Sequence, residues 1–164
     1  MKKAKKNKQS KILSALALKN QLAKWRKLKQ RIVFTNGCFD LLHYGHIDYL
    51  AKARDLGDRL VLGLNTDASI SRIKGPSRPV KDEISRSHIL AAMQCVDAVI
   101  LFDEETPINL ISMISPDVLV KGGDYEVIDI VGHEIVLNNK GKVCTIDFVD
   151  GYSSSALIEK VKTS

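Results

Sequence analysis

The chain has 164 residues, 45% of them hydrophobic, which is enough for one hydrophobic core and too few for two ordinary domains. No apolar run could cross a membrane, no secretory signal begins the chain, and the three cysteines, Cys38, Cys95 and Cys144, are too widely spaced for a disulfide framework or a zinc site. The net charge of +6 is uneven, because residues 1–31 hold 12 of the 25 Lys and Arg residues and no acid, whereas residues 32–164 hold 13 basic and 19 acidic residues.

The N-terminal part is predicted to be a basic tail followed by a helix. We expect residues 1–11 to form a solvated tail and residues 12–164 a single domain in the cytoplasm, without membrane contact. Apolar residues recur at helical spacing between Ile12 and Leu28, which predicts a packing helix of about four turns. The acidic body does not favour nucleic-acid binding, although the tail alone could contact a polyanion.

The rest of the chain alternates between short β-branched runs and amphipathic stretches, a pattern typical of an α/β domain. Five strands are predicted, at 32–35, 60–64, 98–102, 118–120 and 143–148. Their nearly continuous hydrophobicity favours a doubly wound, five-stranded parallel sheet covered on both faces. In such a Rossmann-like sheet ligands bind beyond the carboxyl ends of the strands, so the loops that begin at Asn36, Asn65, Lys121 and Asp150 should converge on one crevice.

Residues 35–46 follow the first strand and contain two histidines, His43 and His46, where an amphipathic helix begins. Imidazoles three residues apart on a first helical turn share a face, and a helix N-terminus favours anions. They could donate hydrogen bonds to phosphate oxygens, with Gly45 allowing close approach. Metal ligation is the alternative, weakened by the lack of a third His or Cys nearby but left open by Asp40.

The motifs of this chain resemble those of a known enzyme superfamily. The pattern Gly37-x-Phe39-Asp40 and His43-x-Gly45-His46 resembles the cytidylyltransferase-like nucleotidyltransferases. Within that superfamily, five segments are similar to the D-glycero-β-D-manno-heptose 1-phosphate adenylyltransferases, which make ADP-heptose: TNGCFD at 35–40, KGPSRP at 74–79, VDAV at 96–99, VKGGDY at 120–125 and GYSSS at 151–155. The likeness covers about residues 22–161.

The resemblance implies a reaction and its partners. ATP would lie along the helix that begins at the histidines, and a sugar 1-phosphate would attack its α-phosphorus in line, releasing pyrophosphate, with Mg²⁺ present and no covalent enzyme intermediate. The product would serve a surface glycan, the lipopolysaccharide core. The resemblance also implies a homodimer and a separate sugar kinase that supplies the 1-phosphate.

Site roles follow from the resemblance together with the strand-end positions. Catalytic roles are predicted for His43, His46, Lys74 and Arg86. Nucleotide contacts are predicted for the two histidines and for Thr35, Asn36, Gly37, Cys38, Phe39, Gly45, Asn65, Gly151, Tyr152, Ser153, Ser154 and Ser155. Contacts with the sugar phosphate are predicted for Asp40, Lys121, Gly122 and Asp124, and the metal ligands stay open.

Each of these assignments has a structural alternative. Lys74 and Arg86 could be ordinary surface charges, the loop at 74–79 a surface turn, and the segment 121–124 a glycine-rich turn. A serine at a helix start caps the helix in most proteins without any ligand.

Two other functions compete with the heptose enzyme. One is transfer of a nucleotide from CTP to another phosphorylated alcohol, such as glycerol 3-phosphate. Glycerol-phosphate cytidylyltransferases carry arginines where this chain has Gln94 and Phe148, which argues against that function. The other is a non-catalytic module that binds nucleotide or RNA.

Overall fold

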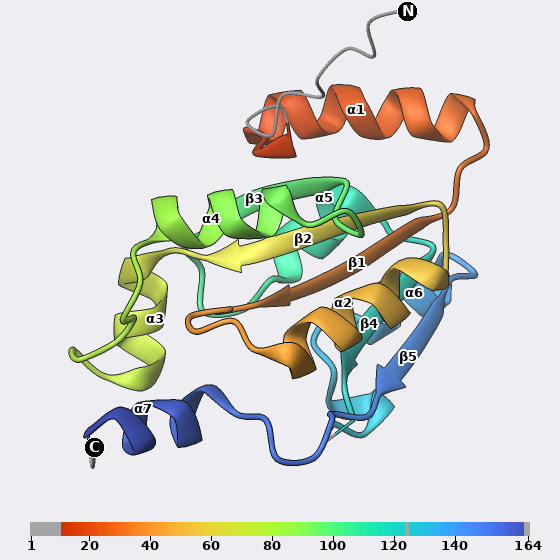
Figure 1. Cartoon of the computed structure of the whole chain (residues 1–164). Helices are drawn as coiled ribbons and strands as arrows, with labels where there is room; N and C mark the ends of the chain where they lie inside the picture. The colour runs from red at the N-terminus through yellow and green to blue at the C-terminus, as the bar shows by residue number, and fades with distance from the viewer. Residues whose placement is uncertain (1–10, 124, 163–164) are drawn as a thin grey trace, which may run out of the picture.

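The computed structural model describes residues 11–123 and 125–162. Within them five strands form one parallel sheet: β1 Ile32–Gly37, β2 Arg59–Asn65, β3 Ala98–Phe102, β4 Val118–Gly122 and β5 Lys142–Ile146. Their order in space is β3-β2-β1-β4-β5, so the predicted doubly wound α/β fold is confirmed (Figure 1). The predicted tail at 1–11 lies outside the described residues except for Lys11.

The ends of the strands are decided by their partners in the sheet. β1 continues to Gly37, beyond the predicted end at residue 35, because its pairing with β2 extends to Gly37 beside Leu64. β5 ends at Ile146, before the predicted end at 148, because its neighbour β4 stops at Gly122, the residue that pairs with Ile146. The hydrophobic pattern therefore located the strands, and the ladder partners set their ends.

Helices cover both faces of the sheet (Figure 1). One face packs against α1 Ala15–Lys27, α5 Ile108–Ile114 and α6 His133–Asn138. The other packs against α2 Tyr44–Asp55 and α4 Glu83–Ala92. Nearer the carboxyl ends of the strands lie α3 Asp67–Lys74, the short 3-10 helix η2 Val127–Asp129 and α7 Ser154–Lys162. No helix in residues 11–123 and 125–162 combines the length and apolar character needed to cross a bilayer.

The predicted N-terminal helix is present but starts later than the apolar pattern suggests. Ser14 caps α1 by accepting a hydrogen bond from the Ala17 N–H at 3.3 Å. Ile12 precedes this cap and instead forms a parallel bridge with Val99 of the edge strand β3. The residues that α1 buries against the sheet are Leu18, Leu22 and Trp25.

The sheet opens where its strand order reverses. β1 and β4 are neighbours but pair only at Val33 with Val118 and at Phe34 with Leu119. By contrast, β1 pairs with β2 along six residues and β4 with β5 along five. The carboxyl ends of β1 and β4 therefore separate, which creates the crevice expected at the switch point of a doubly wound sheet.

Asp97 joins β2, β3 and α2 through a dense set of hydrogen bonds. Its carboxylate accepts from Arg54 Nε at 3.0 Å, from Arg59 Nη1 at 2.9 Å and from the Leu60 N–H at 3.0 Å. Because these bonds are charge-assisted but partly open to solvent, we expect Asp97→Ala to lower the free energy of unfolding by about 2 kcal/mol in urea denaturation. The control Asp55→Ala, at an exposed position on α2, should change it by less than about 0.5 kcal/mol. Equal losses in both variants would contradict this role of Asp97.

Candidate active site

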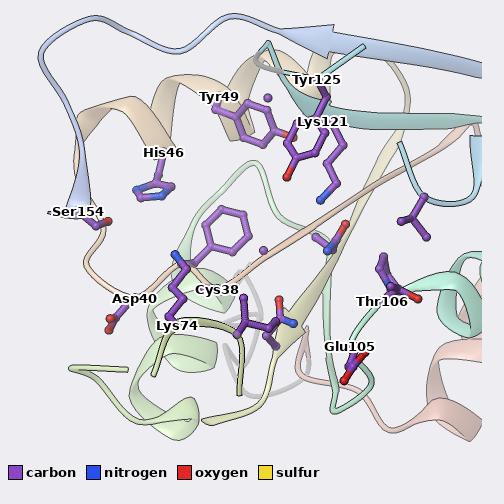
Figure 2. Close-up of a pocket in the computed structure, with 18 of the residues that line it drawn as sticks. Cys38, Asp40, His46, Tyr49, Lys74, Glu105, Thr106, Lys121, Tyr125 and Ser154 are labelled. Carbon is purple, nitrogen blue, oxygen red and sulfur yellow. The ribbon is translucent and has the colours of Figure 1, made fainter. Parts of the chain in front are cut away.

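A cavity of about 490 Å³ opens at the carboxyl ends of the strands (Figure 2). Its volume is typical of a small-molecule binding site. Three of the predicted loops meet there, since Asn36, Asn65 and Lys121 all line it. The fourth loop contributes Phe148 and Ser154 to the wall in place of Asp150, the residue at which that loop was predicted to begin.

The two histidines lie together at the start of α2. His43 is the N-cap residue of the helix, and the centroids of the His43 and His46 rings are 3.9 Å apart, so the two side chains share a face as predicted. His46 lines the cavity, and the partly exposed His43 lies beside it, with its ring centroid 6.2 Å from that of Tyr152. His46 is thus an imidazole available to a ligand, and the catalytic role of His43 stays a prediction.

Both imidazoles are held in the neutral form. Burial, assisted by the electrostatic effects of His43 and Lys74, lowers the pKa of His46 to about 4. Burial also lowers the pKa of His43 below its usual value. The Nδ1 atoms of both rings are buried without a hydrogen-bond partner in the described part of the chain. Because a buried N–H without an acceptor is rarer than an unpaired acceptor, we assign the His46 proton to Nε2, where it can be donated.

Neighbouring side chains fill the space beside Gly45, so a larger residue at this position would crowd them. A Cβ atom added at Gly45 would lie 3.1 Å from Nδ1 of His43 and 3.3 Å from Cβ of Tyr152. Gly45 therefore leaves room for the side chains of His43 and Tyr152 beside the backbone. Its predicted contact with the nucleotide stays a prediction.

The segment 151–155, at the start of α7, is hydrogen-bonded to the loop that precedes the histidines. Ser154 lines the cavity, and its hydroxyl donates to the Leu41 carbonyl at 2.8 Å. Ser153 caps α7 by accepting from the Ala156 N–H at 3.0 Å, which is the capping role common at helix starts. Gly151, Tyr152 and Ser155 are exposed and are not on the cavity wall. Of the five residues in this predicted phosphate motif, the structure brings Ser154 to the site.

Asp40 lines the cavity, but its carboxylate is already occupied. It accepts hydrogen bonds from the Val80 N–H at 2.9 and 3.0 Å and from the Lys81 N–H at 3.0 Å, and it forms an ion pair with Arg78 at 2.8 Å. Burial by itself raises the pKa of Asp40, but the two N–H donors and the Arg78 charge outweigh it and leave the pKa below its usual value. Asp40 therefore anchors the loop after α3 to the loop after β1, and its predicted contact with the substrate stays a prediction.

Arg86 is fully buried and does not reach the cavity. Its guanidinium donates to Asp67 Oδ1 at 2.6 Å, to the Cys38 carbonyl at 2.7 Å and to the Lys81 carbonyl at 3.0 Å. A cation enclosed by these acceptors cannot contact a phosphate in this arrangement. We therefore revise the predicted catalytic role of Arg86: it is a positioning residue that joins three segments around the site.

Thr35 is also buried behind the cavity wall. Its hydroxyl lies 2.7 Å from the hydroxyl of Tyr49, and it is Tyr49 that lines the cavity. The predicted contact of the Thr35 side chain with the nucleotide is therefore corrected to a contact with Tyr49.

The other predicted residues fall on the cavity wall, apart from Asp124, which lies outside the described residues. Those on the wall are Asn36, Gly37, Cys38, Phe39, Asn65, Lys74, Lys121 and Gly122. The Oδ1 atom of Asn36 is buried without a partner in the described residues, so it is an acceptor available to a ligand. Lys121 extends from β4, with its Nζ 5.5 Å from the centre of the Tyr125 ring.

Several lining residues were not predicted, chiefly Tyr49, Arg78, Glu105, Thr106, Tyr125 and Phe148. Glu105 and Thr106 follow the carboxyl end of β3, so the strand-end rule that located the other loops could have found them. Tyr49 and Phe148 carried no motif signal, because an aromatic residue at such a position is equally suited to the core.

The described residues contain no group of three or more His, Cys, Asp or Glu side chains that could hold a metal ion. Asp40, the carboxylate that the sequence left open as a ligand, is occupied by the loop at 78–81. These side chains do not fit a protein-held metal centre. They are compatible with Mg²⁺ bound mainly through substrate phosphates and water, as is common for this ion.

Comparisons with known proteins agree with this architecture. Residues 34–160 match the Cytidylyltransferase-like family. The chain is 53% identical over 159 residues to the bifunctional protein HldE of Citrifermentans bemidjiense, covering 97% of this chain and 33% of that protein. It is 58% identical over 132 residues to HldE of Geobacter sulfurreducens, covering 80% of this chain and 27% of that protein. The chain thus spans about a third of the length of these relatives.

A solved structure, described as the lipopolysaccharide core biosynthesis protein from Thermoplasma volcanium, resembles the chain with a TM-score of 0.59 and 29% identity. The likeness covers 76% of this chain and 99% of that one. The family match begins within β1 and ends within α7, so it includes the elements that form the cavity. The chain therefore belongs to the Cytidylyltransferase-like family and is a nucleotidyltransferase.

Proposed function

We propose that this nucleotidyltransferase joins AMP from ATP to D-glycero-β-D-manno-heptose 1-phosphate, forming ADP-heptose and pyrophosphate for the lipopolysaccharide core. The observation that carries the proposal is the neutral histidine pair at the start of α2, with His46 on the cavity wall. The identity with HldE proteins and the likeness to a lipopolysaccharide core biosynthesis protein support the choice of pathway.

The reaction needs positioning and charge compensation, and the cavity residues are suited to both. A phosphate oxygen of the sugar 1-phosphate attacks the α-phosphorus of ATP, and the bond from that phosphorus to pyrophosphate breaks. Negative charge then grows on the α-phosphate oxygens. His46 donates its Nε2–H to one of them, while the cations of Lys74 and Lys121 stabilise the negative charge of the phosphates.

Members of this family typically use a divalent metal, and we propose Mg²⁺ here. The ion would enter with the triphosphate and supply further positive charge at the phosphates. The protein residues that face those phosphates in this proposal are His46, Lys74 and Ser154.

Three further proposals concern the source of the sugar 1-phosphate, the location of the protein and its oligomeric state. We propose that a sugar kinase activity makes the 1-phosphate, that the protein acts in the cytoplasm where ATP is available, and that it forms a homodimer. These proposals rest on the resemblance to the heptose enzymes.

The direct test is a coupled pyrophosphate assay with ATP or CTP against heptose 1-phosphate, other sugar 1-phosphates and glycerol 3-phosphate. We expect ATP and heptose 1-phosphate to give the highest kcat/KM. A preference for CTP with glycerol 3-phosphate would favour the cytidylyltransferase function. Salt-dependent RNA binding that disappears on deletion of residues 1–11, with no turnover, would instead favour the binding module.

His46→Ala tests the proposed phosphate donor. We expect turnover to fall by about two to three orders of magnitude, as is typical for loss of one donor to a developing negative charge. His88→Ala is the matched control, because His88 is exposed on α4 and bonds through Nδ1 to the Ile84 carbonyl at 2.8 Å. Near wild-type turnover in His46→Ala, with the fold intact by circular dichroism, would reject the proposed role.

The pKa of His46 should respond to nucleotide. In the free protein burial, assisted by the charges of His43 and Lys74, lowers the pKa of His46 to about 4. A triphosphate beside the ring favours the imidazolium form, so binding of a non-hydrolysable ATP analogue should raise the pKa by about 1 or more. An NMR titration of the ring protons measures both values. Identical titration curves with and without the analogue would show that His46 does not contact the phosphates.

A further inference from the structure

The side of the cavity opposite His46 has a different chemistry. Figure 2 shows Glu105 and Thr106 on the side opposite His46 and Ser154, and all four residues line the same cavity. Both come from the segment between β3 and α5, which the sequence motifs did not mark. This part of the wall thus carries a carboxylate and a hydroxyl, whereas the histidine end carries imidazole, the Lys74 cation and the Asp40 carboxylate, whose charge Arg78 compensates.

Contacts on both sides hold this segment in place. Asp103 accepts a hydrogen bond from the Thr66 hydroxyl and forms an ion pair with Arg72 at 3.2 Å. The Ser69 hydroxyl donates to the Glu104 carbonyl at 3.4 Å, and the buried Pro107 begins α5 on the other side. The segment is therefore anchored to α3, so its side chains are presented to the cavity from a fixed backbone.

The two adjacent glutamates have different surroundings. The Glu104 carboxylate turns back and accepts the Asp103 N–H at 3.2 Å, and Glu104 is not on the cavity wall. Glu105 lines the cavity, and in residues 11–123 and 125–162 its carboxylate has no hydrogen-bond or ion-pair partner. Glu105 is thus available to a ligand, and its neighbour provides a control of the same type.

The Glu105 carboxylate indicates which part of the proposed substrates, phosphate, sugar or adenine, binds on this side of the cavity. A carboxylate repels phosphates, so the phosphate groups belong at the histidine end and beside Lys121. It accepts strong hydrogen bonds from hydroxyl groups, of which a sugar has many. The adenine base has a better place against the aromatic residues of the wall, such as Tyr49 and Tyr125, where ring stacking is available.

We propose that Glu105 and Thr106 form the subsite that recognises the sugar hydroxyls of the acceptor. This inference rests on the proposed function and extends it by naming the residues that select a neutral polyhydroxylated group. Glu105 accepts hydrogen bonds from two sugar hydroxyls, and the Thr106 hydroxyl adds a donor or acceptor beside it. An acceptor with a negative charge at the same place is disfavoured by the Glu105 carboxylate.

The test measures kcat and both KM values in the pyrophosphate assay for the full chain and three variants. In Glu105→Gln, the KM for heptose 1-phosphate should rise about tenfold, as expected for loss of charge-assisted hydrogen bonds, with the KM for ATP changed by less than about twofold. Thr106→Val should give a smaller rise in the same constant. Glu104→Gln should match the wild type, because an amide oxygen can still accept the Asp103 N–H.

A second readout uses the charge of the acceptor. The wild type should use a hexose 1-phosphate better than the uronic acid 1-phosphate of the same sugar, and Glu105→Gln should reduce that preference, because the carboxylate that repels the uronate is gone. This comparison needs no change in overall activity and separates a binding role from a loss of folding.

The outcomes distinguish this inference from the proposed function. If the wild type turns over heptose 1-phosphate and Glu105→Gln has unchanged KM values and the same charge preference, the subsite is overturned and the function stands. A rise in the KM for ATP alone would assign Glu105 to the nucleoside and also overturn it. If the wild type uses no sugar 1-phosphate, the function fails and the subsite with it.

Discussion

The site depends on the separation of β1 from β4. These two central strands pair at only two positions, and beyond Phe34 and Leu119 their carboxyl ends diverge. Helix α2 starts near these strand ends and runs along one face of the sheet, and its residues His46 and Tyr49 line the cavity. Polar residues at the strand ends, such as Asn36 and Lys121, thereby line a cavity instead of a core. The helix N-terminus that carries the histidines opens onto the same space.

Buried charges hold the loops around this gap in place. Asp40 and Arg86 lie on opposite sides of Lys81, one accepting its N–H and the other donating to its carbonyl. Each charge is compensated, Asp40 by Arg78 and Arg86 by Asp67, so neither is left unpaired in the interior. Loss of one partner would leave a buried charge without compensation and release the loop that follows Lys74. Two predicted site residues thus hold the loops of the site in place, Asp40 from the cavity wall and Arg86 from the interior.

The sequence could predict whatever depends on local periodicity. The strands follow from apolar runs, and the contact of His43 with His46 follows from their spacing. The burial of Thr35 and Arg86 depends on Tyr49 and Asp67, which fold next to them, and neither partner is visible from residue type alone. The segment at 105–106 has no motif, but it follows the carboxyl end of the predicted strand at 98–102, so the strand-end rule could have placed it at the cavity.

The histidine pair also shows why the site should be selective for anions. Packing of His43 between His46 and Tyr152, which the absence of a side chain at Gly45 permits, excludes water from both Nδ1 atoms. Burial then keeps the rings uncharged until a polyanion arrives, so the free protein avoids two adjacent cations that would repel each other. Ser154 fixes the Leu41 carbonyl at the entrance to this loop. The same packing that makes protonation unfavourable in the free protein therefore also holds His46 at the cavity wall, where we propose that it meets a phosphate.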